Sequence, residues 1–325
     1  MQDILIIGSG PAGLAVASEA SRQGLRCGVI EKGALVNSIT RFPSSMQFFS
    51  PTPDFELAGF PFISQTGAPL RDEVIRYYQR SARRIENTTY YLKYKATEVI
   101  GSDKAFLIKC TNLLLQKEAQ LRSRKIVVAS GCFDQPRTLQ IRGEDMQHVS
   151  HYYHEPWDYE GLRVVVVGGG DSALEASIEL ALTGARVSHI YRGSELSRPQ
   201  PWLKERFERL VSSRSIDFHS EANLLEIRED RVVLQFKIRG EQTLPCEAVL
   251  ILTGYRPNDE LLQKVGLTLD FAKLTPVFFP ETCETNINGI YVTGALLAGT
   301  DFGTIAIEKY KEHAQAIVKD IQSKL

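Results

Sequence analysis

Several features are scarce in this chain of 325 residues, and each shortage excludes a class of protein. Five cysteines are too few for a disulfide scaffold, and 38 basic against 39 acidic residues leave no basic excess for nucleic acid. No apolar run reaches the roughly 18–20 residues that span a bilayer. Met1-Gln2-Asp3 lacks the basic region of a signal peptide, and the apolar run after it enters a glycine motif. We therefore expect a cytoplasmic protein that binds neither nucleic acid nor membrane.

What the chain does contain is one pattern that occurs twice. A short apolar, β-branched run meets a glycine-rich turn at residues 3–13 and again at residues 163–173. Each turn opens a helical pattern, over residues 14–22 and 174–182, and a second strand follows each helix. Apolar runs of this length are typical of strands that are buried on both faces of a parallel sheet. The sequence therefore predicts two βαβ units.

The first glycine turn has the spacing of a dinucleotide site, Gly8-x-Gly10-x-x-Gly13. Gly8 permits a tight turn, Gly10 lets a pyrophosphate approach the backbone, and Gly13 lets the helix pack against the strand. The helix N-terminus supplies amide donors and a positive dipole end to phosphate. Glu31 ends the second strand, where a carboxylate accepts hydrogen bonds from ribose hydroxyls. The alternative is a strand, turn and helix with incidental glycines, which the spacing and Glu31 together disfavour.

The second turn, Gly168-x-Gly170-x-x-Ala173, ends in alanine, which the dinucleotide pattern permits. Arg192 stands at the end of the following strand in place of a carboxylate, and Arg198 lies close by. A guanidinium offers a planar fork of donors that suits the 2′-phosphate of NADP. The alternative for either arginine is a solvated surface charge. Two dinucleotide sites in one chain indicate electron transfer from a nicotinamide to a flavin and then to an acceptor.

The remaining segments complete the predicted α/β fold. Residues 125–131, 248–254 and 289–294 each have the pattern of a strand that ends at a glycine. An amphipathic helix is predicted over residues 70–85, and a final helix over residues 304–319.

Together these motifs resemble the flavoproteins with two dinucleotide-binding domains that are typified by low-molecular-weight thioredoxin reductase. The resemblance covers essentially the whole chain. It implies an FAD-binding domain, residues 1–150 and 257–325, that is split around an inserted NADPH-binding domain, residues 151–256. In such proteins the crossings between domains act as a hinge, and a homodimer is usual.

The resemblance also implies which residues hold the two cofactors. The expected FAD residues are Gly8, Gly10, Pro11, Ala12, Gly13, Glu31, Lys32, Asn37, Ser38, Phe49, Ser130, Gly131, Gly294, Ala295, Thr304 and Ile305. The expected NADPH residues are Gly168, Gly170, Asp171, Ser172, Ala173, Arg192, Arg198 and Gly254. Thr304 and Ile305 are expected at the start of the last helix, where amide groups would face the N1/O2 edge of a reduced flavin.

Two departures separate the chain from thioredoxin reductase. That family has a Cys-x-x-Cys pair before the NADPH turn, whereas residues 151–154 read His-Tyr-Tyr-His, which excludes thioredoxin reduction by that route. The closing motif continues from Gly294 to Ala295, where the family has Asp. Both departures resemble a narrower family, the bacillithiol-disulfide (bacilliredoxin) reductases. The residues behind this likeness lie in segments 37–50, 149–153, 184–193 and 284–294.

Membership of this narrower family would imply NADPH-dependent, FAD-mediated reduction of a low-molecular-weight disulfide, bacillithiol disulfide. One departure leaves the acceptor open, because that family has Cys inside the first turn and this chain has Ala12. A redox protein is a further acceptor. A flavin monooxygenase is an alternative, although the Gly143-x-x-x-x-His148 element is one residue longer than that family's. A redox-sensing protein with little turnover is a third reading.

The candidate catalytic residues are Cys132 and His151. Cys132 follows a predicted crossing between domains, and a thiol that works with flavin needs a low pKa. The other cysteines fall mostly on predicted buried strands. His151 is a candidate proton donor to a leaving thiolate, and its alternative is a hydrogen-bonded linker histidine. The nearby His148 and His154 suggest no metal site, because no second ligand cluster accompanies them.

Overall fold

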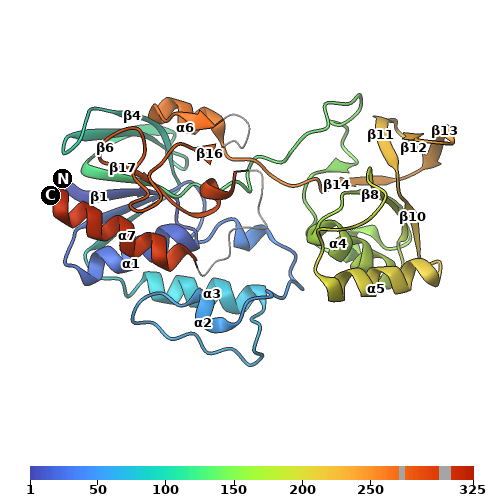
Figure 1. Cartoon of the computed structure of the whole chain (residues 1–325), viewed down its shortest axis with the longest axis horizontal. Coiled ribbons are helices and arrows are strands. Elements are labelled where there is room, and N and C mark those ends of the chain that lie inside the picture. The colour runs from blue at the N-terminus through green and yellow to red at the C-terminus, as the bar shows by residue number, and fades with distance from the viewer. Residues whose placement is uncertain (271–274, 300–308) are drawn as a thin grey trace. The chain divides into compact units, whose positions relative to one another are not determined.

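The computed structural model describes residues 1–270, 275–299 and 309–325, which form two units (Figure 1). The first unit comprises residues 1–135 and 256–325, and the second comprises residues 136–255. The sequence analysis placed the first boundary after residue 150, whereas the first unit ends at residue 135. Backbone pairing ties the intervening segment, residues 136–150, to the second unit. The Ile227 amide donates to the Arg142 carbonyl at 2.9 Å, and Val149 pairs with Val249.

A seven-stranded sheet forms the centre of the first unit, in the order β3-β2-β1-β6-β5-β4, with β17 also paired to β6. The strands β1, β2, β3, β6 and β17 run parallel, β5 pairs antiparallel with β6, and β4 pairs antiparallel with β5. Their bounds are β1 Gln2–Ile7, β2 Cys27–Glu31, β3 Thr88–Leu92, β4 Tyr94–Ile100, β5 Phe106–Asn112, β6 Lys117–Val128 and β17 Ile290–Val292. Two short strands, β15 Leu269–Asp270 and β16 Thr275–Pro276, pair separately.

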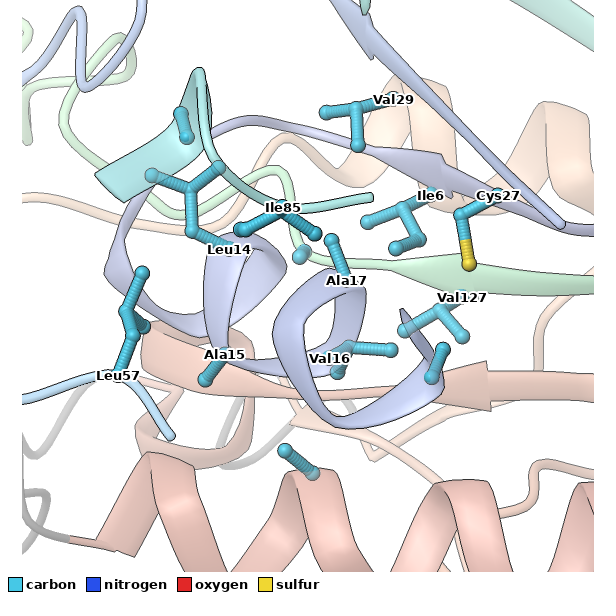
Figure 2. Close-up of a cluster of buried hydrophobic side chains, with 14 of the residues drawn as sticks. Ile6, Leu14, Ala15, Val16, Ala17, Cys27, Val29, Leu57, Ile85 and Val127 are labelled. Carbon is cyan, nitrogen blue, oxygen red and sulfur yellow. The ribbon is translucent and has the colours of Figure 1, made fainter. Parts of the chain in front are cut away.

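The helix α1, Pro11–Arg22, lies between this sheet and α7, Lys309–Lys324, and is buried on nearly every side (Figure 2). Small residues such as Ala15 and Ala17 allow this close packing on both faces. Proline at its first position lacks an amide that would have no partner there, and Gly24 beyond its end has a φ of +74°. The helix therefore begins at the glycine turn, where a dinucleotide motif requires it.

The other helices of the first unit are α2 Thr52–Phe55, α3 Arg71–Ala82 and α6 Asp259–Val265, with 3₁₀ helices at Ile39–Arg41 and Gly294–Ala298. The predicted amphipathic helix is thus confirmed as α3. The phenylalanine-rich segment before it serves the core: Phe55 and Phe62 are buried, and Phe62 stacks on Tyr77 at 4.4 Å between ring centroids. The described part of the final helix is α7; its predicted start at residue 304 lies outside the described residues.

The second unit has a five-stranded parallel sheet in the order β10-β9-β8-β14-β7, and a three-stranded antiparallel sheet, β11-β12-β13. The bounds of these strands are β7 Val149–Ser150, β8 Arg163–Val167, β9 Arg186–Ile190, β10 Ile216–His219, β11 Ala222–Ile227, β12 Arg231–Phe236, β13 Gly240–Pro245 and β14 Ala248–Ile251. The helices are α4 Asp171–Leu182 and α5 Pro201–Ser212, with a 3₁₀ helix at Pro156–Tyr159. The structure confirms the α/β prediction and both βαβ starts, with four consecutive valines in β8.

In residues 1–270, 275–299 and 309–325, no helix has the length and apolarity needed to cross a membrane. The same stretches contain no group of three or more His, Cys, Asp or Glu side chains that could hold a metal ion.

Candidate functional site

The first glycine turn connects β1 to α1 at the carboxyl edge of the parallel strands. A Cβ on Gly8 would come within 2.3 Å of the Ala129 carbonyl oxygen, and one on Gly13 within 2.1 Å of the Gly8 oxygen. A Cβ on Gly10 would meet nothing within 4 Å. The two outer glycines are therefore required by packing, whereas the middle one leaves backbone exposed to open space, where a pyrophosphate approaches in dinucleotide sites.

Glu31 is buried behind this turn, and its carboxylate binds the turn itself. The Ser9 amide and the Ser9 hydroxyl each donate to Glu31 Oε2 at 3.0 Å, and the Gly33 amide donates to Oε1 at 2.7 Å. A carboxylate has about four acceptor positions, so three bonds leave room for a ribose hydroxyl at Oε1. Glu31 thus fixes the shape of the turn as well as offering an acceptor to a ribose.

Two buried hydroxyls lie at the ends of the neighbouring strands. Ser130 Oγ follows β6 and Thr293 Oγ1 follows β17, and neither has a hydrogen-bond partner among the described residues. Buried hydroxyls normally have partners, so an orphan pair beside a glycine turn indicates a bound polar group. Gly131 leaves open space for a Cβ, and Gly294 approaches the turn so closely that its Cβ would lie 2.8 Å from Ala12 Cβ. These features fit an FAD held at this edge.

The other predicted FAD residues surround the turn in supporting positions. Lys32 Nζ lies 2.7 Å from Asp134 Oδ2, and Arg41 Nη1 lies 2.8 Å from Oδ1 of the same carboxylate. Asn37 Oδ1 accepts from the Ala34 amide at 3.3 Å. The structure therefore places Lys32 in an ion pair that ties two loops together. Of the rest, Pro11 starts α1, Ser38 precedes a 3₁₀ helix, Ala295 lies in another and Phe49 is exposed; Thr304 and Ile305 lie outside the described residues.

The second glycine turn repeats this geometry between β8 and α4. A Cβ on Gly168 would lie 2.4 Å from the Leu252 oxygen, and one on Gly170 would meet nothing within 4 Å. The middle glycine again faces open space. Gly169, which stands between these two glycines, lies close to Tyr191. A Cβ on Gly169 would lie 2.1 Å from the Tyr191 ring, and a Cβ on Gly193 would lie 2.7 Å from the same ring. Tyr191 thus fills the place behind the turn, a contact that the sequence analysis did not anticipate.

The loop that carries the predicted phosphate-binding arginines is anchored to α4. Asp171 Oδ1 accepts from the Gln200 amide at 2.8 Å, so the carboxylate holds the loop and does not face a ligand with that oxygen. Arg192 and Arg198 are exposed, and within the described part of the chain neither forms an ion pair with a carboxylate. Ser172 is exposed at the start of α4, and Gly254 has a φ of +95° beyond β14.

A third arginine joins this edge from a distant part of the sequence. The Arg137 amide donates to the Gly254 carbonyl at 2.9 Å, and Arg137 Nε donates to the Tyr255 carbonyl at 3.2 Å. The Thr253 hydroxyl donates to the Arg137 carbonyl at 2.9 Å. Burial, followed by repulsion from Arg198 and Arg192, lowers the pKa of Arg137, so the three guanidinium groups share one region. No local sequence pattern marks Arg137, because the chain crossing brings it there.

Comparisons with known proteins show the family to which the chain belongs. The family model for pyridine nucleotide-disulphide oxidoreductases matches residues 5–294. The chain belongs to this family. Bacilliredoxin reductase Bdr of Bacillus subtilis (strain 168) is 33% identical over 318 residues, which cover 98% of this chain and 96% of that protein. A ferredoxin–NADP reductase of Ignicoccus hospitalis is 24% identical over 301 residues, 90% of each chain.

Solved structures give the same result. The structure of bacillithiol disulfide reductase Bdr (YpdA) from Bacillus cereus has a TM-score of 0.96 and 32% identity, and covers 100% of this chain and 99% of that one. Membership of the pyridine nucleotide-disulphide oxidoreductase family makes the protein an oxidoreductase that binds FAD and a nicotinamide dinucleotide. Its thioredoxin-reductase-like fold agrees with the resemblance found in the sequence.

In a member of this family the cysteines require particular attention, and all five are free thiols here. Burial raises the pKa of Cys132 to about 12, with a further contribution from Asp134. Burial likewise raises the pKa of Cys27 to about 12 and those of Cys110, Cys246 and Cys283 to about 11. Nucleophilic attack on a disulfide requires thiolate, so these values count against Cys132 as a reactive thiol.

The candidate proton donor His151 lies directly after β7 in the second unit. Its Nε2 is 3.5 Å from Glu144 Oε1, and its buried Nδ1 has no partner among the described residues. Glu144 also accepts from the Leu139 and Gln140 amides at 2.7 Å, so it holds a turn together. A Cβ on Gly143 would lie 2.1 Å from the Ile227 carbonyl oxygen, so packing alone requires glycine at this position. Gly143 therefore gives no support to the monooxygenase alternative.

Proposed function

We propose that this protein is an FAD-dependent NADPH oxidoreductase that reduces a low-molecular-weight disulfide, with bacillithiol disulfide as the first candidate. The balanced reaction is NADPH + H⁺ + RSSR → NADP⁺ + 2 RSH. The observation that carries the proposal is the full-length similarity to bacilliredoxin reductase Bdr, which spans both glycine turns. The turns support it independently, because each leaves its middle glycine open to a pyrophosphate.

The proposal assigns FAD to the first unit, residues 1–135 and 256–325, and NADPH to the second unit, residues 136–255. The acidic Glu31 behind the first turn suits a ribose with free hydroxyls and disfavours a 2′-phosphate. At the second turn Arg192, Arg198 and Arg137 provide a cationic region that suits the 2′-phosphate of NADPH. The two sites therefore differ in the charge that they present.

The chain's own residues bind and orient the reactants in this scheme. Gly10 and Gly170 open the turns to the two pyrophosphates, and the amide ends of α1 and α4 lie behind them. The Ser130 and Thr293 hydroxyls are available to the flavin end of the first cofactor. Bound FAD would supply two-electron redox chemistry between the nicotinamide and the disulfide. His151 remains our candidate for protonating the departing thiolate.

A second acceptor class has its own support. Ala12 offers no thiol, and the five protonated cysteines give no nucleophile for thiol–disulfide exchange. The similarity to ferredoxin–NADP reductases suggests a one-electron carrier instead. That reaction balances as NADPH + 2 oxidised carriers → NADP⁺ + H⁺ + 2 reduced carriers.

The oligomeric state and the compartment are further parts of the proposal. We expect a homodimer in the cytoplasm, where thiols such as these stay reduced.

The first experiment measures anaerobic NADPH consumption by the FAD-loaded protein with and without bacillithiol disulfide. Consumption that requires the disulfide supports the reductase and means that no cysteine at position 12 is needed. The matched variant Ala12→Cys restores the thiol that the narrower family has. Flavin reduction in one turnover, with no further NADPH consumption for either protein, contradicts the disulfide, and ferredoxin is then added to the same mixture.

The preference for NADPH is tested at Arg192. Arg192→Gln removes a charged donor worth about 1.5–3 kcal/mol, so the preference for NADPH over NADH should fall roughly tenfold to a hundredfold. Arg209→Gln on α5 is the control, because it removes an exposed arginine away from the turn. Equal preference in both variants and the unaltered protein would contradict the assignment of NADPH to this unit.

A further inference from the structure

A histidine is fully buried beneath the second glycine turn. His189 occupies the fourth position of β9 and has an exposed fraction of 0%. Its ring packs edge-on against Phe207 of α5 at 4.8 Å and is tilted against Phe218 of β10 at 5.7 Å, both between ring centroids. A buried polar side chain in such an apolar setting is costly unless each polar atom has a partner.

Both ring nitrogens of His189 have partners. Nε2 lies 2.9 Å from the Gly168 carbonyl oxygen, and Nδ1 lies 2.8 Å from Ser177 Oγ. A carbonyl oxygen only accepts, so Nε2 carries the hydrogen, and the neutral ring then accepts at Nδ1 from the Ser177 hydroxyl. Burial lowers the pKa of His189 to about 4, which agrees with a neutral ring at neutral pH.

The bond to Gly168 fixes the backbone at the start of the turn, two residues before the open Gly170. Gly168 is the first glycine of the turn, and its amide already donates to the Ile190 carbonyl at 3.1 Å. In a planar trans peptide, the carbonyl of one residue and the amide of the next point in opposite directions. Because His189 holds the Gly168 carbonyl, the Gly169 amide points to the opposite side, on which the equivalent Ser9 amide donates to Glu31 in the first turn.

The first unit holds its turn by other means. The register partners Ile6–Val29 and Val166–His189 are equivalent, so Val29 takes the place of His189, and Ala17 that of Ser177. The amide after Gly8 is instead fixed by Glu31. The second unit has no such carboxylate, since Tyr191 stands there. The His189–Ser177 pair is therefore an addition specific to the second turn.

We propose that His189, supported by Ser177, is a positioning residue for the dinucleotide pyrophosphate: its Nε2–H fixes the Gly168 carbonyl and so sets the path of the backbone into Gly170, the glycine that is open to the phosphates. This inference rests on the proposed nucleotide site of the second unit. His189 itself touches no ligand. The expected signature is a loss of affinity that depends on the pyrophosphate and is independent of the 2′-phosphate.

The test compares the binding of NADP⁺ and of adenosine 2′-monophosphate, which has the 2′-phosphate and lacks the pyrophosphate, by calorimetry on the FAD-loaded protein. His189→Leu should weaken NADP⁺ about tenfold, the effect of one hydrogen bond, and change adenosine 2′-monophosphate less than twofold. His189→Gln should recover most of the affinity, because its amide nitrogen can reach the Nε2 position. Ile178→Val, a methyl deletion in the buried face of α4, is the packing control.

The other outcomes count either against the inference or, separately, against the NADPH proposal. Unchanged NADP⁺ binding by His189→Leu, with stability lowered as in Ile178→Val, would make His189 a packing residue only. Equal loss for both ligands would mean a generally disordered site, as would failure of His189→Gln to recover binding. If the unaltered protein binds neither ligand but binds NAD⁺, the NADPH proposal fails, and NAD⁺ against adenosine then tests His189 separately.

Discussion

The two dinucleotide units of this chain can be compared residue by residue, because position n of the first corresponds to n + 160 of the second: Gly8 to Gly168, Gly10 to Gly170 and Gly13 to Ala173. The backbone follows the same offset, since the Gly8 amide bonds to Ile30 and the Gly168 amide to Ile190. Both middle glycines face open space. The strand, turn and helix thus form the same structural motif in both units.

The differences lie behind and beside the turn. Glu31 corresponds to Tyr191 and Lys32 to Arg192, so a buried carboxylate in one unit is replaced by a ring, and an ion-paired lysine by an arginine without an acidic partner among the described residues. The comparison shows that the same glycine spacing is held in place by different residues in the two units. In the proposed function, the spacing provides for a pyrophosphate and the residues one strand away select the nucleotide.

The largest expected effect breaks the comparison at the third glycine. Gly13→Ala forces a Cβ to within 2.1 Å of a backbone oxygen, an overpacking that should cost roughly 3 kcal/mol or more and displace α1. Ala173→Gly makes the reverse change and should cost only about 1 kcal/mol of helix propensity. Flavin content and thermal unfolding measure both. A Gly13→Ala protein with normal flavin content would show that the two helices sit alike on their turns.

The second prediction concerns the carboxylate that only the first unit has. Glu31→Gln removes the charge that accepts from the Ser9 and Gly33 amides, and should weaken FAD roughly tenfold to a hundredfold. Glu19→Gln is the control, since Glu19 is equally buried. Its carboxylate accepts hydrogen bonds from Arg22 at the end of α1 and from Gln23 just after it. The measurement is the dissociation constant of FAD from the two apoproteins. Similar values for both would remove the special role of Glu31.

The third prediction uses two titrating groups that have apolar counterparts in the first unit. His189 corresponds to Val29 and Glu175 to Ala15. Burial lowers the pKa of His189 to about 4, and burial, Asp171 and Glu179 raise that of Glu175 to about 7. Between about pH 4.5 and 6.5 the unfolded chain binds one more proton than the folded chain at His189, and one fewer at Glu175.

These two contributions to the pH dependence of stability oppose each other in that window. His189 makes the protein less stable as pH falls, and Glu175 makes it less stable as pH rises, each by up to about 1.4 kcal/mol per pH unit. Denaturant unfolding of Glu175→Gln should therefore show stability lost on acidification. His189→Leu should show stability lost as pH rises toward 7. Parallel pH profiles for the two variants would contradict both assignments.

The sequence predicted the repeated strand–turn–helix motif well and the side-chain contacts around that motif poorly, for physical reasons. Glycine spacing, buried strands and Glu31 are local signals that periodicity and motif chemistry can detect. Arg137 reaches the second site through a chain crossing, which no local pattern marks. His189 lies on a buried strand, where a lone histidine gives no sign of the serine on the next helix that makes its burial tolerable. Tyr191 could have been found by the 160-residue offset from Glu31.

The smallest expected effect concerns the residue after each crossing glycine, Cys132 in the first unit and Tyr255 in the second. With its pKa near 12, the Cys132 thiol stays protonated, so Cys132→Ser should leave the rate of NADPH-dependent turnover within about twofold of the unaltered protein. Ala12→Cys is the informative contrast, because it adds a thiol beside Gly294 at the flavin edge. Anaerobic turnover with bacillithiol disulfide measures both. A large loss in Cys132→Ser, with flavin content unchanged, would mean that the thiol is exposed and ionised during turnover, and would make the two crossings chemically different.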